Sequence, residues 1–125
     1  MGVDTSALYS VIFSRLSTQH ERVYKVKAPS TKTFPYVVFR LESVTDSYPS
    51  DDYYLNVDIY DDPNTAITVA EALGDKIDGD LNHKVIIDSG NNFHFEREQR
   101  QSVDLQELVG AYLVNIRYVV RAYFD

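Results

Sequence analysis

The chain of 125 residues and 14.3 kDa has the size of one domain, and a hydrophobic content of 44% is sufficient for a buried core. Its 12 Lys and Arg residues against 19 Asp and Glu residues give a net charge of −7, which disfavours a general affinity for nucleic acid through phosphate contacts. The absence of cysteine excludes disulfides, thiolate nucleophiles and cysteine-ligated metals. We therefore expect a single domain over residues 1–125 that is stabilised by packing.

The N-terminal segment predicts a helix over residues 4–17. Asp4 or Thr5 can cap its first turn, and its apolar residues recur at helical spacing as Leu8, Val11, Ile12 and Leu16. The segment carries an acid at position 4 and no long apolar run, so we expect neither a signal peptide nor a membrane span, and synthesis in the cytosol. A short strand over residues 22–26 and a loop over residues 27–33 follow.

Two segments with alternating apolar residues predict strands over residues 35–42 and 51–60. The second has the clearer pattern, with one face made of Tyr53, Leu55, Val57 and Ile59. Between them, residues 43–50 contain Asp46, Tyr48 and Pro49 and are too many for a tight turn. We expect these eight residues to form a projecting hairpin loop.

A second helix is predicted over residues 63–81, because Asp62 can cap it and Pro63 suits its first turn. Its apolar face comprises Ala66, Val69, Ala70, Leu73, Ile77 and Leu81. The Asp78-Gly79-Asp80 sequence interrupts this pattern, so the last turn is expected to fray or to end early.

The C-terminal third predicts three strands. Residues 85–87 and 93–98 are interpreted as a hairpin around the polar turn at residues 88–92. Residues 112–124 give the strongest strand pattern, with Asn115, Arg117 and Arg121 on one face. Its other face comprises Tyr112, Val114, Ile116, Tyr118, Val120, Ala122 and Phe124.

These elements, in the order α-β-β-β-α-β-β-β, predict an α+β domain. We expect a largely antiparallel β-sheet with the two amphipathic helices packed on one face. Residues 43–81 hold ten acids against one base, Lys76, which suits an assembling surface. The same excess of acid is equally explained by turns and helix caps that keep a tyrosine-rich protein in solution.

The sequence contains no recognisable catalytic, nucleotide-binding or metal-binding motif. Its three histidines have no metal-ligand spacing. Asp58, Asp61 and Asp62 are better explained by a strand face and a helix cap than by a cation site. Residues 78–82 match the start of a calcium loop, but His83 and Ser89 replace the glycine and glutamate that such a loop needs. We therefore predict a protein that is not an enzyme and that has no catalytic residue, cofactor or metal.

Tyrosine is the unusual feature of the composition, with eight of its ten residues concentrated on predicted strands and their loops, namely Tyr36, Tyr48, Tyr53, Tyr54, Tyr60, Tyr112, Tyr118 and Tyr123. Tyrosine is enriched in protein interfaces. Several outward-facing tyrosines beside charged residues therefore indicate contacts with other proteins, although about half of them are equally expected to complete the core.

The order of these features resembles the tail completion or tail terminator proteins of tailed bacteriophages. The matching features are an N-terminal helix with Ala7-Leu8-Tyr9, then Val23-Tyr24, Ala28-Pro29, Phe34-Pro35-Tyr36-Val37-Val38-Phe39, Val57-Asp58-Ile59-Tyr60-Asp61, a helix, and a closing strand with Ile116-Arg117-Tyr118. The resemblance covers nearly the whole chain, and relatives often have Trp where this sequence has Tyr60.

The resemblance implies a structural virion protein, located in the tail or neck and assembled in the host cytoplasm. Its copies would form a ring, a hexamer in this family, at the head-proximal end of the tail tube. The ring would end tail polymerisation and join the tail to the neck. The implied partners are other copies of the chain, the tail tube protein and a head-completion or neck protein, with DNA only as cargo passing through the ring and no membrane contact.

Six residues are candidates for these contacts. We expect the loop from Ser43 to Asp52, with Tyr48 and Tyr54, to contact tube or neck proteins, and the arginines of the closing strand to contribute to contacts between copies. The interface candidates are Tyr48, Asp51, Asp52, Tyr54, Arg117 and Arg121. For the two arginines, a solvated sheet face is an equally good explanation. The alternatives are a head-closure or other neck connector and, in a different class, a small metal-binding protein or hydrolase.

Overall fold

The structure, a computed structural model, describes residues 5–28, 33–47, 50–62, 67–105 and 110–124. Within these ranges the chain forms two helices and six strands, and the predicted element order and α+β class are confirmed. The elements are α1 (Thr5–Gln19), β1 (Val23–Lys25), β2 (Tyr36–Ser47), β3 (Ser50–Asp61), α2 (Ile67–Leu81), β4 (Val85–Asp88), β5 (Asn91–Leu105) and β6 (Ala111–Tyr123).

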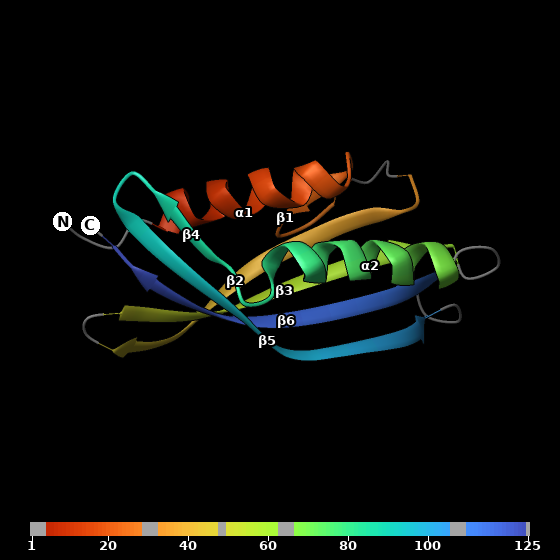
Figure 1. Cartoon of the computed structure of the whole chain (residues 1–125). Coiled ribbons are helices and arrows are strands. Elements are labelled where there is room, and N and C mark those ends of the chain that lie inside the picture. The colour runs from red at the N-terminus through yellow and green to blue at the C-terminus, as the bar shows by residue number, and fades with distance from the viewer. Residues whose placement is uncertain (1–4, 29–32, 48–49, 63–66, 106–109, 125) are drawn as a thin grey trace.

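The six strands form one sheet in the order β1-β2-β3-β6-β5-β4. Strand β1 runs parallel to β2, and all other neighbours are antiparallel. Both helices lie over the same face of the sheet (Figure 1), as the sequence predicts. We call this the inner face and the opposite one the outer face. Strands β1 and β4 form the two edges of the sheet.

The core lies between the helices and the inner face. The inward sets predicted for β3 and for the centre of β6 are buried, whereas Tyr112 and Phe124 at the ends of the closing strand are only partly buried. The helices contribute Leu8, Ile12 and Leu16 from α1 and Ala70, Leu73, Ile77 and Leu81 from α2. Alternating burial on the strands and three- or four-residue spacing on the helices direct these side chains into one layer.

The hairpin between β2 and β3 differs from the prediction. Residues 43–50 were expected to form a loop, but β2 continues to Ser47 and β3 begins at Ser50, and these two residues pair with each other. Backbone hydrogen bonds hold the ribbon together, and they do not require the apolar alternation that the prediction used. Tyr48 and Pro49 lie outside the described residues.

Three further predictions about element boundaries and faces need correction. Helix α2 does not end early at Asp78-Gly79-Asp80 but continues to Leu81, because tertiary contacts of its last turns outweigh the low helix propensity of glycine. Val69 was placed on the buried face and is 50% exposed. Strand β5 is longer than the predicted 93–98 because it follows β6 as far as Leu105. The predicted helix start at residues 63–66 lies outside the described residues.

Candidate functional site

The predicted interface residues that the structure describes lie together on β3 and β6. Asp52 is directly opposite Arg121, and Asp51 is opposite Ala122. The Arg117 guanidinium lies over the Tyr54 ring, 4.7 Å from its centroid. Asp52, Tyr54 and the two arginines occupy outer-face positions, whereas Asp51 shares the inner-face alternation of the buried residues. The sixth candidate, Tyr48, lies outside the described residues.

Arg117 is held in place by its neighbours on the outer face. Its Nε donates to Asn56 Oδ1 at 3.2 Å, and Asn56 Nδ2 donates to Glu42 Oε1 at 2.8 Å. Glu98 Oε1 lies 3.9 Å from the guanidinium. These contacts bury Asn56 to 3% exposure although it points away from the core. Arg117 therefore orders this part of the outer face and still exposes 34% of its side chain.

Arg121 borders a shallow pocket of about 370 Å³ on the same face. The pocket is also lined by His94, Glu96, Val119 and Tyr123, and His94 meets the Tyr123 ring edge-on at 5.2 Å between centroids. The pocket combines apolar walls with charged groups of both signs, which suits contact with another protein.

The three aspartates considered for a cation are not arranged as one site. Asp58 faces the outer side of β3 and accepts a hydrogen bond from Asn115 Nδ2 at 2.6 Å. Asp61 faces the inner side and is 2% exposed, and its Oδ1 accepts from the backbone N–H of Asp62. Burial raises the pKa of both carboxyls. Among the described residues, no cluster of three or more His, Asp or Glu side chains is placed to hold a metal ion.

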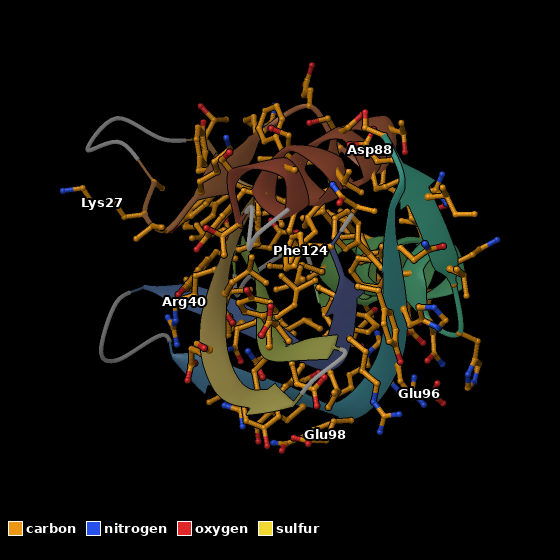
Figure 2. All side chains as sticks on the ribbon, turned by 90° about the vertical axis from the view of Figure 1, so that its left-hand side faces the viewer. Lys27, Arg40, Asp88, Glu96, Glu98 and Phe124 are labelled. Carbon is orange, nitrogen blue, oxygen red and sulfur yellow. The ribbon has the colours of Figure 1, made fainter. Side chains whose placement is uncertain are left out.

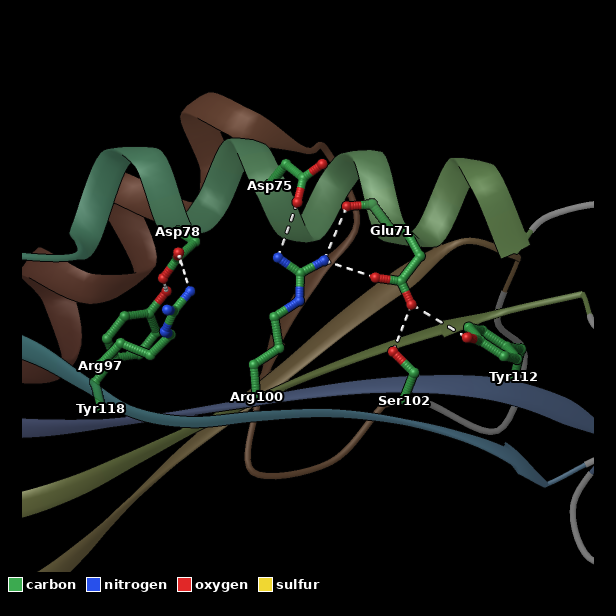
Figure 3. A network of polar contacts seen from close by, with 8 residues as sticks. All are labelled: Glu71, Asp75, Asp78, Arg97, Arg100, Ser102, Tyr112 and Tyr118. Carbon is green, nitrogen blue, oxygen red and sulfur yellow. Dashed lines mark hydrogen bonds and ion pairs between the residues drawn. The ribbon is translucent and has the colours of Figure 1, made fainter.

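A polar network between α2 and β5 was not predicted (Figure 3). Arg100 donates to Glu71 Oε1 at 2.7 Å and to Asp75 Oδ1 at 2.9 Å. The other carboxylate oxygen of Glu71 accepts from the hydroxyls of Ser102 and of Tyr112. These hydrogen bonds, that from Ser102 first, lower the pKa of Glu71. One turn beyond Asp75 on α2, Asp78 accepts hydrogen bonds from Arg97 Nη1 at 2.7 Å and from Tyr118 Oη at 2.9 Å (Figure 3).

Arginines pair with four of the ten acids of residues 43–81, all of them on α2. Arg97 and Arg100 neutralise acids of α2, and Arg15 lies 3.4 Å from Asp80. Strict alternation would place Arg97 and Arg100 on opposite faces of β5. A register shift between Arg97 and Gln99 turns both toward α2, which is why the sequence pattern did not reveal the network. The polar network has a structural role, because its hydrogen bonds attach α2 to the sheet.

A stack of aromatic rings occupies the outer face near the start of β2 and the end of β3. Phe34 stacks on Tyr36 at 5.7 Å between centroids, and Tyr36 stacks on Tyr60 at 5.0 Å. Tyr24 meets Tyr36 edge-on at 6.3 Å. Together with Val26 and other neighbours, the stack lines a pocket of about 380 Å³. Part of the tyrosine excess therefore builds an outer-face cluster and not the core.

Comparisons with known proteins show a likeness of fold only. No protein-family model matches the chain, and no curated protein matches its sequence. A chain in the virion of a native gene transfer agent particle superposes with a TM-score of 0.70 at 11% identity, over 90% of this chain and 92% of that chain. A second solved structure, of a protein without a functional name, gives a TM-score of 0.68 at 13% identity over 99% of both chains. At these identities the likeness shows a shared fold.

None of the described helices is both long and apolar enough to cross a bilayer.

Proposed function

We propose that this chain is a structural virion protein of a tailed phage, prophage or related particle. It forms a ring, with six copies as the working number, at the head-proximal end of the tail tube. The ring ends tail polymerisation and joins the tail to the neck. Its partners are further copies of itself, the tail tube protein and a neck protein, and DNA passes through the ring as cargo. The proposed role requires no catalysis, metal or cofactor.

One observation carries the proposal: the chain has the fold of a protein in a virion over 90% of its own length and 92% of that chain. A match over both full lengths means that the domain, and not a common substructure, is shared. The order of the sequence motifs, which resembles that of tail completion proteins, supports the assignment of the chain to the tail. The motifs concern the order of short segments along the chain, and the superposition concerns how those segments are arranged in space.

The β2–β3 hairpin is the part of the molecule that we assign to tube or neck contacts. Its two strands remain paired as far as Ser47 and Ser50 and extend to one end of the molecule (Figure 1). Beside it, the outer face carries Tyr54 and Arg117 in a fixed arrangement. A paired ribbon loses less conformational freedom on binding than a loose loop, which favours a defined docking geometry.

Electron microscopy of particles produced without this gene tests the proposal. We expect full heads beside unattached tails of irregular or excessive length, and a plasmid copy of the gene should restore complete virions. Tails of normal length beside heads that have lost their DNA would support the alternative of a head-closure connector. Wholly normal virions would contradict both roles.

A double substitution tests the assignment of the hairpin. Tyr48→Ala with Asp52→Ala is expected to leave the fold intact and to abolish tail joining. Val69→Ala with Lys76→Ala is a suitable control, because both residues are exposed on α2. Normal infectivity of the hairpin variant, with the protein present at its usual level, would contradict this assignment.

A further inference from the structure

The two edges of the sheet carry opposite charge. Residues 22–28, which include β1, contain three bases and no acid, whereas residues 85–96, which include β4 and the start of β5, contain two acids and no Lys or Arg. With the next residue on both sides, residues 21–29 carry +2 and residues 84–97 carry 0, because Lys84 and Arg97 are added. Arg97 is paired with Asp78 inside the domain, which leaves Asp88 and Glu96 as the acids of this edge. We call these segments the basic edge (residues 22–28) and the acidic edge (residues 85–96).

Both edges also expose large apolar side chains. On the acidic edge, Val85 is 53% exposed and Ile87 is 70% exposed. These two residues alternate on the outer face of β4, opposite His94 and Asn92. On the basic edge, Val26 is 59% exposed, and Phe34 beside it is 38% exposed. An apolar edge strand is a template for pairing with another chain, so each edge has the features of a contact surface.

Val26 also has an unusual backbone conformation. Its φ angle is +67°, in a region that β-branched residues rarely adopt. The strained residue lies between two pockets, one lined by the aromatic stack and one lined by Tyr9 of α1. This geometry ends β1 and turns an apolar side chain outward beside Lys27.

The two edges lie on opposite sides of the molecule. In Figure 2, Lys27 projects on one side, and Asp88 and Glu96 lie on the other. Strands β1 and β4 are at the two ends of the strand order. Surfaces that are different and lie on opposite sides form head-to-tail contacts, and such contacts generate a ring when the rotation between copies closes.

We propose that the acidic edge of one copy binds the basic edge of the next copy. The inference rests on the proposed function, because it assigns the contact from which that ring is built. Ile87 and Val85 pack against Val26 and the aromatic stack of the neighbour, and Asp88 and Lys27 bring opposite charges together. The occupant of each edge is a second copy of this chain, since the charges and the apolar residues of the two edges complement each other.

Cross-linking tests the contact, because the chain has no cysteine of its own. A variant with Lys27→Cys and Asp88→Cys, treated with a flexible bis-maleimide, should give a ladder of covalent species that ends at the ring size. The reaction is run on purified particles and on the free protein. Lys27→Cys with Val69→Cys is the matched control, since Val69 is exposed but lies on α2. Each single-cysteine variant should remain monomeric on a denaturing gel.

The outcomes separate this inference from the proposed function. Particles that contain the double variant but give only monomers would overturn the edge contact and leave the virion role intact. Dimers from either single variant would also overturn it, because they indicate that the same edge meets itself across a two-fold axis. Absence of the wild-type protein from particles would contradict the proposed function. In that case cross-linking of the free double-cysteine variant tests the edge contact. A ladder of covalent species would support the contact, and monomers alone would refute it.

Discussion

Replacing Gly74 by alanine should stabilise the protein only when residue 100 is not arginine. A Cβ atom at position 74 would lie 2.9 Å from Arg100 Nη2 and 3.4 Å from a methyl carbon of Val114. The first distance is shorter than any normal contact, so the guanidinium must move. Its bonds to Glu71 Oε1 at 2.7 Å and to Asp75 at 2.9 Å would be lost or lengthened.

Two free energies of similar size then oppose each other. Glycine to alanine within a helix stabilises by about 1 kcal/mol. The charged hydrogen bond to Glu71 contributes about 1–2 kcal/mol after allowance for partial exposure of the pair, while the bond to the exposed Asp75 adds little. We expect Gly74→Ala to be neutral or to destabilise the wild-type protein by about 1 kcal/mol. In an Arg100→Met background the same change should stabilise by about 1 kcal/mol.

Urea unfolding of the wild-type protein, the two single variants and the double variant measures the coupling energy between positions 74 and 100. A coupling of about 1–2 kcal/mol is expected at neutral pH. Hydrogen bonds lower the pKa of Glu71 below its ordinary value of 4.5, so its stabilising ionic form is present above that value and is lost as the pH falls through the lowered pKa. The coupling should therefore decrease in acid. Equal stabilisation by Gly74→Ala in both backgrounds would refute the reasoning.

Three further substitutions test other parts of the structure. Tyr118→Phe removes the hydroxyl that donates to Asp78 and should lower the free energy of unfolding by about 1 kcal/mol; an unchanged urea midpoint would contradict this. Asp61→Asn should stabilise at pH 7 by about 1 kcal/mol, because burial raises the pKa of Asp61 and its Oδ2 has no hydrogen-bond partner among the described residues. The gain should disappear as the pH falls below 3.8, where the carboxyl is protonated in both states; a gain that persists there would count against the burial argument. Val26→Asn should raise the melting temperature, with a gain of up to about 1 kcal/mol, because asparagine tolerates the positive φ better than valine; a loss of stability would show that the valine side chain has a folding role in the monomer.

The apolar patterns of the sequence predicted most of the elements correctly. Alternation at residues 53–59 and in the centre of β6 identified the buried face of the sheet, because a central strand with one covered face needs this pattern. Helix α1 followed from the spacing of Leu8, Ile12 and Leu16. The prediction failed where pairing depends on the backbone and not on side chains. The polar ends of the β2–β3 hairpin and of β5 gave no signal, and their strands were predicted too short.

The candidate contacts were predictable only as residue types. The sequence indicated that Tyr54, Arg117 and Arg121 face outward. It did not indicate that Arg117 lies over Tyr54 or that Asp52 is opposite Arg121. Such pairs depend on strand register, which a residue list does not contain. The aromatic stack of Phe34, Tyr36 and Tyr60 likewise requires β2 and β3 to be aligned.

The sequence by itself determined the class of the fold, the order of its elements and the absence of cysteine chemistry, because periodicity and composition are local properties of the chain. Only the tertiary structure decided how the charges are paired and where the edges of the sheet lie. The register shift in β5 turns Arg97 and Arg100 toward α2 and neutralises acids that composition alone suggested for an external partner. The strand order separates the basic edge from the acidic edge, since contacts between residues far apart in the chain are set by packing and hydrogen bonding across the whole domain.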